Sequence, residues 1–88
     1  MEVLLIVRNA VDVGALLREA RRSRQMTQSE LADATGVSRQ WLISTEQGAP
    51  TARIDLVLAA LNNVGLLVDL SPDEQGDTIE TIMARARA

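Results

Sequence analysis

The sequence has no cysteine, no histidine and no lysine, and Trp41 is its single aromatic residue. Without cysteine or histidine the chain can form neither a disulfide nor a zinc site of the usual ligands. Cys-His pairs, Ser-His-Asp triads and histidine-bound catalytic metals are excluded for the same reason. We therefore expect a protein that is not an enzyme and that needs no cofactor or metal ion.

Long apolar runs are absent too. No segment approaches the roughly 18 apolar residues of a membrane-spanning helix. The apolar start at residues 3–7 follows Glu2, whereas a secretory signal peptide begins with a basic region. The sequence thus predicts a cytoplasmic protein without membrane contact.

The chain has enough apolar material for one small domain with a tail. Of its 88 residues, 47% are hydrophobic, which is too much for a disordered chain. A core of this size is marginal, and small domains often gain stability from a partner subunit. Oligomerisation is the remaining source of stability in a chain without disulfide or zinc.

The charges are unevenly distributed. The net charge is −3, and all nine basic residues are arginine. Residues 8–53 carry seven arginines against five acidic residues, whereas residues 54–88 carry two against six. The net charge argues against a nucleic-acid partner, but the distribution indicates two partners of opposite character. Charges scattered over an ordinary solvated surface are the alternative.

Pattern and capping signals predict short elements in series. The β-branched and leucine-rich residues 3–7 indicate a strand. Asp12 is placed to cap a helix that runs to about Arg24, with further arginines in its last turns, where cations complement the helix dipole. The apolar face of this helix comprises Val13, Leu16, Leu17 and Ala20.

Two further helices follow, with a tight turn between them. Thr27 and Glu30 fit a capping box, in which each side chain accepts a hydrogen bond from the other residue's backbone. Gly36 ends this short helix because glycine adopts the left-handed conformation at low cost. Ser38 then caps a third helix from Arg39 to about residue 47.

The second half of the chain is predicted to contain a fourth helix, a strand and a tail. Thr51 is placed to cap a helix over residues 52–63, and residues 66–70 indicate a second strand. Residues 78–88 can form a last amphipathic helix. The inward residues expected in the fourth helix are Ile54, Val57, Leu58 and Leu61.

Two short helices joined by a glycine turn form the core of a helix-turn-helix. The segments Thr27–Ala32, Gly36–Gln40 and Glu46–Gly48 resemble the XRE type of phage-repressor and Cro-like DNA-binding domains. Within that family, Arg39–Leu42 followed by a strand at Leu66–Leu70 is most similar to HipB-type antitoxins. The resemblance implies a protein that represses its own operon and binds a HipA-type serine/threonine kinase toxin.

The expected fold class is mainly α: a lambda-repressor-like helix-turn-helix domain of four to five helices, with short β-strands near both ends used in dimerisation. Four parts follow along the chain. They are an N-terminal strand (1–10), the helix-turn-helix DNA-binding domain (11–65), a dimerisation strand (66–71) and an acidic C-terminal tail or short helix (72–88).

The second helix of such a motif lies in the major groove and presents its first residues to base edges. The resemblance places Arg39, Gln40 and Ser44 toward DNA. Arginine can pair with guanine, and glutamine with adenine, through two hydrogen bonds each. Gln28 and Ser38 begin helices, where amides and side chains often hold phosphates. The alternative is that all five are ordinary exposed polar residues, and capping alone explains Ser38.

Three residues are expected to support this interface. The resemblance implies an internal ion pair between Arg21 and Glu46, which orients helices more than it stabilises them. Trp41 is expected to be a partly buried plug between the recognition helix and its neighbours, with base contact as the alternative. Two residues depart from the family pattern: Ile43 stands in place of a small polar residue near phosphate, and Thr45 in place of an apolar core residue.

The predicted strands concern assembly, because an open apolar strand edge is an aggregation hazard. The resemblance implies a homodimer in which the strand after the fourth helix pairs with its counterpart, and residues 3–7 add an outer strand. A hairpin between the two segments of one monomer is the alternative. A dimer places two recognition helices roughly 34 Å apart and implies a palindromic operator. The expected dimerisation residues are Leu66, Leu67, Val68 and Leu70.

These observations predict a dimeric, operator-binding repressor that acts as the antitoxin of a kinase toxin. One alternative is a protein-interaction module that sequesters a partner, in which Ile43, Thr45 and the net negative charge have abolished DNA binding. Another is a stand-alone repressor without a toxin. The acidic tail is either a toxin-binding or protease-sensitive segment or a solvated tail.

Overall fold

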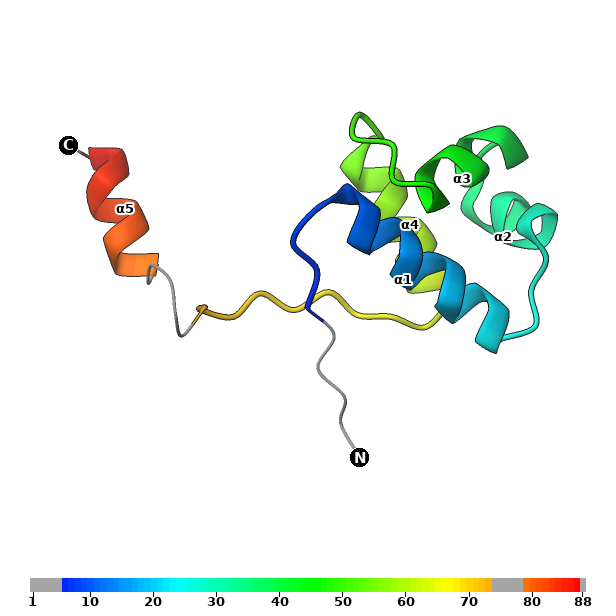
Figure 1. Cartoon of the computed structure of the whole chain (residues 1–88), viewed down its shortest axis with the longest axis horizontal. Coiled ribbons are helices and arrows are strands. Elements are labelled where there is room, and N and C mark those ends of the chain that lie inside the picture. The colour runs from blue at the N-terminus through cyan, green and yellow to red at the C-terminus, as the bar shows by residue number, and fades with distance from the viewer. Residues whose placement is uncertain (1–5, 74–78, 88) are drawn as a thin grey trace.

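The computed structural model describes residues 6–73 and 79–87 of the chain. Its regular elements within these ranges are all helices, and Figure 1 shows the first four packed together, with the fifth beyond an extended segment. The mainly α fold class is therefore confirmed. The helices are α1 (Ala10–Ser23), α2 (Gln28–Thr35), α3 (Arg39–Glu46), α4 (Ile54–Asn63) and α5 (Ile79–Arg87).

The predicted β-strands are not seen. Residues 66–70 pair with no other part of the chain that the structure describes, so the strand predicted there is not seen. Ile6 and Val7 are not in a strand either, and the remaining residues of the predicted N-terminal strand lie outside the described ranges. The hairpin alternative also fails for the described residues. A strand needs a hydrogen-bonding neighbour, and neither described segment supplies one to the other.

The start of α1 lies earlier than the sequence predicts. Asn9, and not Asp12, is the N-cap, and its side-chain oxygen accepts a hydrogen bond of 2.8 Å from the Asp12 backbone N–H. The Asp12 carboxylate instead accepts from the backbone N–H of Arg8, at 3.0 Å. Asn and Asp are equally good caps, so the position of the first helical turn was ambiguous between them.

The predicted turn between α2 and α3 is confirmed. The Glu30 N–H donates to the Thr27 hydroxyl at 3.0 Å, and the Thr27 N–H donates to the Glu30 carboxylate at 2.9 Å. Gly36 follows α2 with φ 77°, a left-handed conformation that side chains other than glycine adopt only with strain. Ser38 caps α3 by accepting from the Trp41 N–H at 3.0 Å. Gly36 and the Ser38 cap together fix the angle between α2 and α3 through local interactions.

The prediction for α4 was wrong in its cap and in part of its inward face. The helix begins at Ile54, after Arg53, and has no side-chain cap from Thr51. Ile54 is 74% exposed and Leu58 is 43% exposed. The helix is apolar on nearly every side, so its 3.6-residue period does not select a face. Its contact with α2 selects the face instead, through Val57, Ala60, Leu61 and Val64.

The core is small and draws on each helix of the bundle. Leu17, Leu31 and Leu42 are its largest fully buried side chains, one each from α1, α2 and α3. Trp41 is half-buried and packs against this cluster. Gly14 lets α1 and α3 touch through their backbones, because a Cβ here would lie 2.7 Å from the Glu46 carbonyl oxygen. The core therefore holds α3 against both α1 and α2.

None of the helices that the structure describes is both long and apolar enough to cross a membrane.

The capping box gives a test of the α2 start. Replacing Thr27 with alanine removes the hydroxyl acceptor, and we expect the free energy of unfolding to fall by about 1 kcal/mol. The backbone and side-chain hydrogen bonds to Thr27 lower the pKa of Glu30 from its ordinary value of 4.5. A lowered folded pKa adds stability above the unfolded value and loses it as the pH falls through the folded one.

Carbon NMR titration of the Glu30 carboxyl checks this expectation. In Thr27→Ala the titration should move up toward 4.5, and the loss of stability between pH 5 and pH 3 should become shallower. The shift is expected to be partial, because alanine keeps the backbone N–H whose hydrogen bond lowers this pKa most. A wild-type Glu30 pKa that is not lowered would show that the box is not formed in solution. Ser29→Ala, which removes an exposed hydroxyl outside the cap, is the matched control.

Candidate nucleic-acid interface

A buried ion pair joins the C-terminal half of α1 to the end of α3. The Arg21 Nε donates to Glu46 Oε2 at 2.7 Å, and a second guanidinium nitrogen donates to Glu46 Oε1 at 3.1 Å. A third donates to the Met26 carbonyl at 2.9 Å. The two side chains are 9% and 3% exposed. This paired geometry is the strongest form of the arginine–carboxylate contact, and it ties the two helices at a fixed distance.

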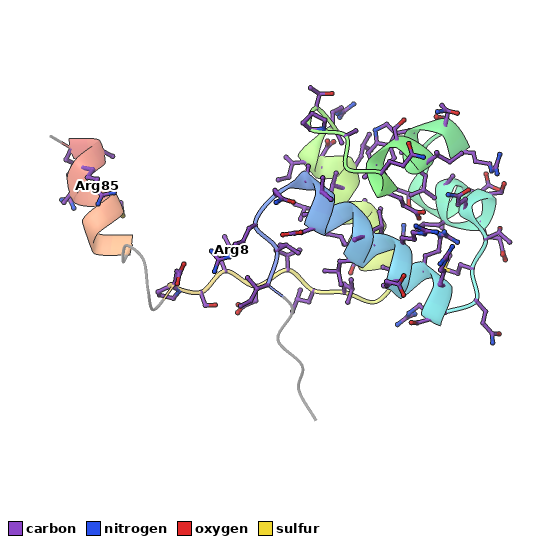
Figure 2. All side chains as sticks on the ribbon, in the orientation of Figure 1. Arg8 and Arg85 are labelled. Atoms are coloured by element: carbon purple, nitrogen blue, oxygen red, sulfur yellow. The ribbon has the colours of Figure 1, made fainter. Side chains whose placement is uncertain are left out.

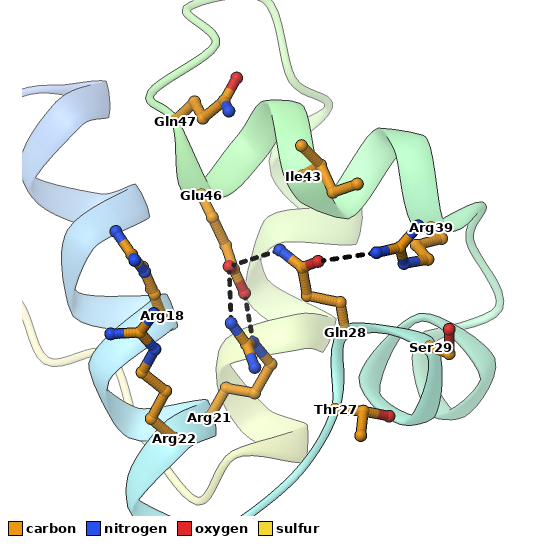
Figure 3. A pocket seen from close by; sticks show the side chains of 10 residues that line it. All are labelled: Arg18, Arg21, Arg22, Thr27, Gln28, Ser29, Arg39, Ile43, Glu46 and Gln47. Atoms are coloured by element: carbon orange, nitrogen blue, oxygen red, sulfur yellow. Dashed lines mark hydrogen bonds and ion pairs between the residues drawn. The ribbon is translucent and has the colours of Figure 1, made fainter.

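The pair extends outward into a chain of hydrogen bonds that ends at the surface (Figure 3). The Gln28 amide NH2 donates to Glu46 Oε1 at 3.2 Å. The Gln28 amide oxygen accepts a long hydrogen bond of 3.5 Å from the Arg39 guanidinium. The carboxylate accepts and the guanidinium donates, so these two neighbours fix which way the Gln28 amide faces. The exposed arginine at the start of α3 is thereby connected to the buried pair.

The five predicted DNA-contacting residues divide between the two sides of α3. On one side, Gln28 and Arg39 border an open hollow of about 620 Å³, here called the α1–α3 hollow. On the other side, Ser38, Gln40 and Ser44 border a shallower hollow of about 350 Å³ next to the α3–α4 loop. The α1–α3 hollow is lined by Arg18, Arg21, Arg22, Thr27, Gln28, Ser29, Arg39, Ile43, Glu46 and Gln47.

Exposure differs among these residues in a way that suits different roles. Ser38, Arg39 and Gln40 are exposed at the first turn of α3, whereas Ser44 and Gln28 are half-buried. The Ser38 oxygen already accepts the Trp41 N–H, so its hydroxyl retains a proton to donate. The first turn of α3 therefore presents long, polar side chains on the surface, where a ligand can reach them.

Thr45 and Ile43, the two departures from the family pattern, leave this surface intact. Thr45 is 4% exposed, and its hydroxyl donates to the Trp41 carbonyl at 2.9 Å. A buried hydroxyl that bonds to the carbonyl one turn earlier leaves no unsatisfied polar group in the core. Ile43 is half-buried and lines the α1–α3 hollow. Neither residue disturbs the first turn of α3.

Arg18 and Arg22 were not among the predicted site residues. Both are exposed on α1 and line the α1–α3 hollow on the side opposite Arg39 (Figure 3). Their spacing of four residues places them on one face of the helix, which was the available signal. The sequence interpretation assigned the arginines near the end of this helix to the helix dipole, because nothing in the sequence showed that this end would lie beside α3.

Comparison with known proteins assigns the helix-turn-helix of this chain to a family. A family model described as a helix-turn-helix domain matches residues 12–72. A relative from Sinorhizobium fredii (strain NBRC 101917 / NGR234), named uncharacterized HTH-type transcriptional regulator y4mF, is 37% identical over 70 residues. That alignment covers 78% of this chain and 92% of the relative. The chain belongs to the helix-turn-helix domain family, as an XRE-like member.

Removing one partner of the buried ion pair tests how much the α1–α3 contact depends on it. In Glu46→Ala the Arg21 guanidinium stays buried without its counter-charge, and we expect unfolding to require about 3–5 kcal/mol less. The double variant Arg21→Met/Glu46→Leu, which removes both charges, should recover most of that loss. Chemical denaturation at neutral pH measures both.

The exposed pair of Arg53 and Asp55 offers the matched control. Its atoms also meet at 2.7 Å, but its side chains are 72% and 60% exposed, and exposed pairs contribute little. Asp55→Ala should therefore leave the denaturation midpoint nearly unchanged. Equal effects from Asp55→Ala and Glu46→Ala would contradict the importance given to burial.

Proposed function

We propose that this protein is a sequence-specific DNA-binding transcriptional regulator, a repressor that inserts the first turn of α3 into the major groove. The observation that carries the proposal is the placement of Arg39 and Gln40. Both are exposed at the start of a helix whose other faces are held by the core and by the buried ion pair. A helix presented in this way fits the major groove of B-DNA.

The chemistry of the first turn matches base edges. Arg39 can donate two hydrogen bonds to guanine, and Gln40 can both donate to and accept from adenine. Gln28 restrains Arg39 through the 3.5 Å hydrogen bond. The Arg39 side chain therefore loses less conformational entropy when it binds. Ser38 and Ser44 supply hydroxyls to backbone or bases on the other side of α3.

The Sinorhizobium relative supports this function through its printed name, an HTH-type transcriptional regulator. The charge distribution supports it as well, since the arginines around α1 and α3 gather on one hollow despite a net charge of −3. Binding through such a patch releases counterions and weakens as salt rises. A protein-interaction module that does not bind DNA would not need this cluster of arginines.

Arg39→Ala tests the base contact. We expect operator affinity to fall by roughly 1–3 kcal/mol and selectivity to relax at one base pair, because only one side chain is removed from the groove. Gel shifts with the upstream promoter and with single-base-pair variants of the bound site measure both effects, over a series of salt concentrations.

Arg8→Ala is the control for charge alone. Arg8 precedes α1 at the end remote from the α1–α3 hollow (Figure 2), so this variant should keep the wild-type base preference. A footprint and base preference unchanged in Arg39→Ala would remove Arg39 from the interface. Wild-type binding that lacks both salt dependence and sequence preference would favour the interaction-module alternative.

We further propose that the protein acts as a homodimer on a palindromic operator, with residues 66–70 buried between two copies. Leu67 and Leu70 are 91% and 90% exposed, and Val68 is 49% exposed. Leu66 differs from them, since it is half-buried against the chain's own core. Adjacent exposed apolar side chains commonly mark an interaction site, and a two-fold dimer would place two α3 helices for successive major grooves.

Sedimentation velocity at micromolar concentration checks the dimer. Wild-type protein should sediment as a dimer, and Leu67→Ser/Leu70→Ser should shift it toward the monomer because the buried apolar area is lost. Ile54→Ser changes an equally apolar residue that is 74% exposed on α4 and should leave the dimer intact. A monomeric wild-type protein would rule out this assembly.

The more specific role of antitoxin to a HipA-type kinase rests on the resemblance of Arg39–Leu42 and of the segment after α4. A kinase-like gene beside the coding sequence, and a stable complex when the two are co-expressed, would support it. A stand-alone repressor is expected to have no such neighbour. The acidic tail from Asp73 onward is the natural place to seek the contact, through a variant that replaces Asp73 with asparagine.

A further inference from the structure

The α1–α3 hollow concentrates positive charge in a chain that is negative as a whole. Four of its ten lining residues are arginines and one is acidic, while the chain carries a net charge of −3. The acidic residue, Glu46, is occupied by Arg21 in the buried ion pair. Arg18, Arg22 and Arg39 therefore contribute three positive charges to the hollow without a matching carboxylate in its lining.

The usual interactions of an arginine within a helix do not account for Arg18. It is exposed and makes no hydrogen bond or ion pair with another described residue. It lies more than one turn before the end of α1 at Ser23, where the dipole effect has faded. The residues three and four positions away on the helix face are Gly14, Ala15, Arg21 and Arg22. None is acidic, so α1 offers Arg18 no partner and places a second like charge beside it.

The start of α2 forms another side of the same hollow, through Thr27, Gln28 and Ser29. The first N–H groups of a helix have no acceptor within it and form its positive end. The Thr27 hydroxyl takes up the Glu30 N–H, which leaves the backbone N–H groups of Gln28 and Ser29 outside the cap. Arginine side chains and the first residues of α2 thus border the same open space, and both are groups that bind phosphate in proteins.

We propose that Arg18 and Arg22 bind backbone phosphates of the DNA strand that borders the groove entered by α3. The proposal rests on the proposed function and adds two residues to it. The rim of the hollow is shared with α3 through Arg39 and Ile43, so a ligand in the hollow lies against the helix that reads the bases. The hollow is open and measures about 620 Å³, which suits a length of backbone better than one isolated anion.

The test compares two double variants, each of which removes two positive charges. Arg18→Gln/Arg22→Gln alters the hollow, whereas Arg8→Gln/Arg87→Gln alters residues outside its lining. Operator affinity is measured by fluorescence anisotropy over a series of salt concentrations, with the bound promoter site and with single-base-pair variants. Circular dichroism melts verify that the wild-type protein and both double variants fold, which exposed arginines replaced by glutamine should not prevent.

In the hollow variant we expect the slope of log affinity against log salt to become shallower by about 1–2, since each phosphate contact contributes about −0.9. Affinity should fall by a similar factor on every site variant, because phosphate contacts carry no base information. The control pair should keep the wild-type slope. A hollow variant with the wild-type slope, or with altered base preference, would overturn the proposal.

Failure of this proposal is distinct from failure of the proposed function. If wild-type protein shows no salt-dependent, sequence-specific binding, the function itself is wrong. If it does and the hollow variant matches it, only the assignment of Arg18 and Arg22 is wrong. Titration with inorganic pyrophosphate at constant ionic strength separates the two sources of phosphate. Saturation at micromolar pyrophosphate, lost in the hollow variant, would replace the DNA backbone with a small anion as the ligand.

Discussion

The arrangement of this small protein depends on the contact between Arg21 and Glu46. The pair lies between the C-terminal half of α1 and the end of α3, with two hydrogen bonds inside a nearly water-free space. Burial makes both charges dependent on each other, because either alone would be costly. The same carboxylate also accepts from Gln28, which in turn contacts Arg39. One acidic side chain therefore connects the packing of the core with the position of the exposed arginine that we assign to base contact.

The sequence predicted those parts of the fold that local chemistry determines. The capping box at Thr27, the left-handed turn at Gly36 and the Ser38 cap each need only a few neighbouring residues. The face of α4 could not be predicted in the same way, since that helix is apolar nearly all round and its contact with α2 decides which side is buried. The strand at residues 66–70 failed for a related reason. An alternating or apolar sequence favours extended backbone, but a β-strand forms only when a second strand supplies its hydrogen-bond partners.

The residues of the candidate interface also divide into those that local sequence predicts and those that only the folded chain brings together. Arg39 and Gln40 follow directly from their place after Ser38 at a helix start, where a motif of this kind presents side chains outward. Gln28 lies half-buried between Glu46 and Arg39, and its contact with phosphate stays a prediction. Arg18 and Arg22 belong to a helix distant in sequence from α3, and only the folded chain brings them to the same hollow. Charge counts along the chain gave the sign of this surface but not its position.

Gly14 limits how such a protein can change. Its missing side chain lets the backbone of α1 touch the carbonyl oxygens at the end of α3, so any larger residue at position 14 would push these two helices apart. A substitution at Gly14 would therefore also displace α3 relative to the rest of the bundle. The exposed side chains on the outer face of α3 can be exchanged without this displacement, so we expect a new ligand preference to come from them while the angle of the helix is kept.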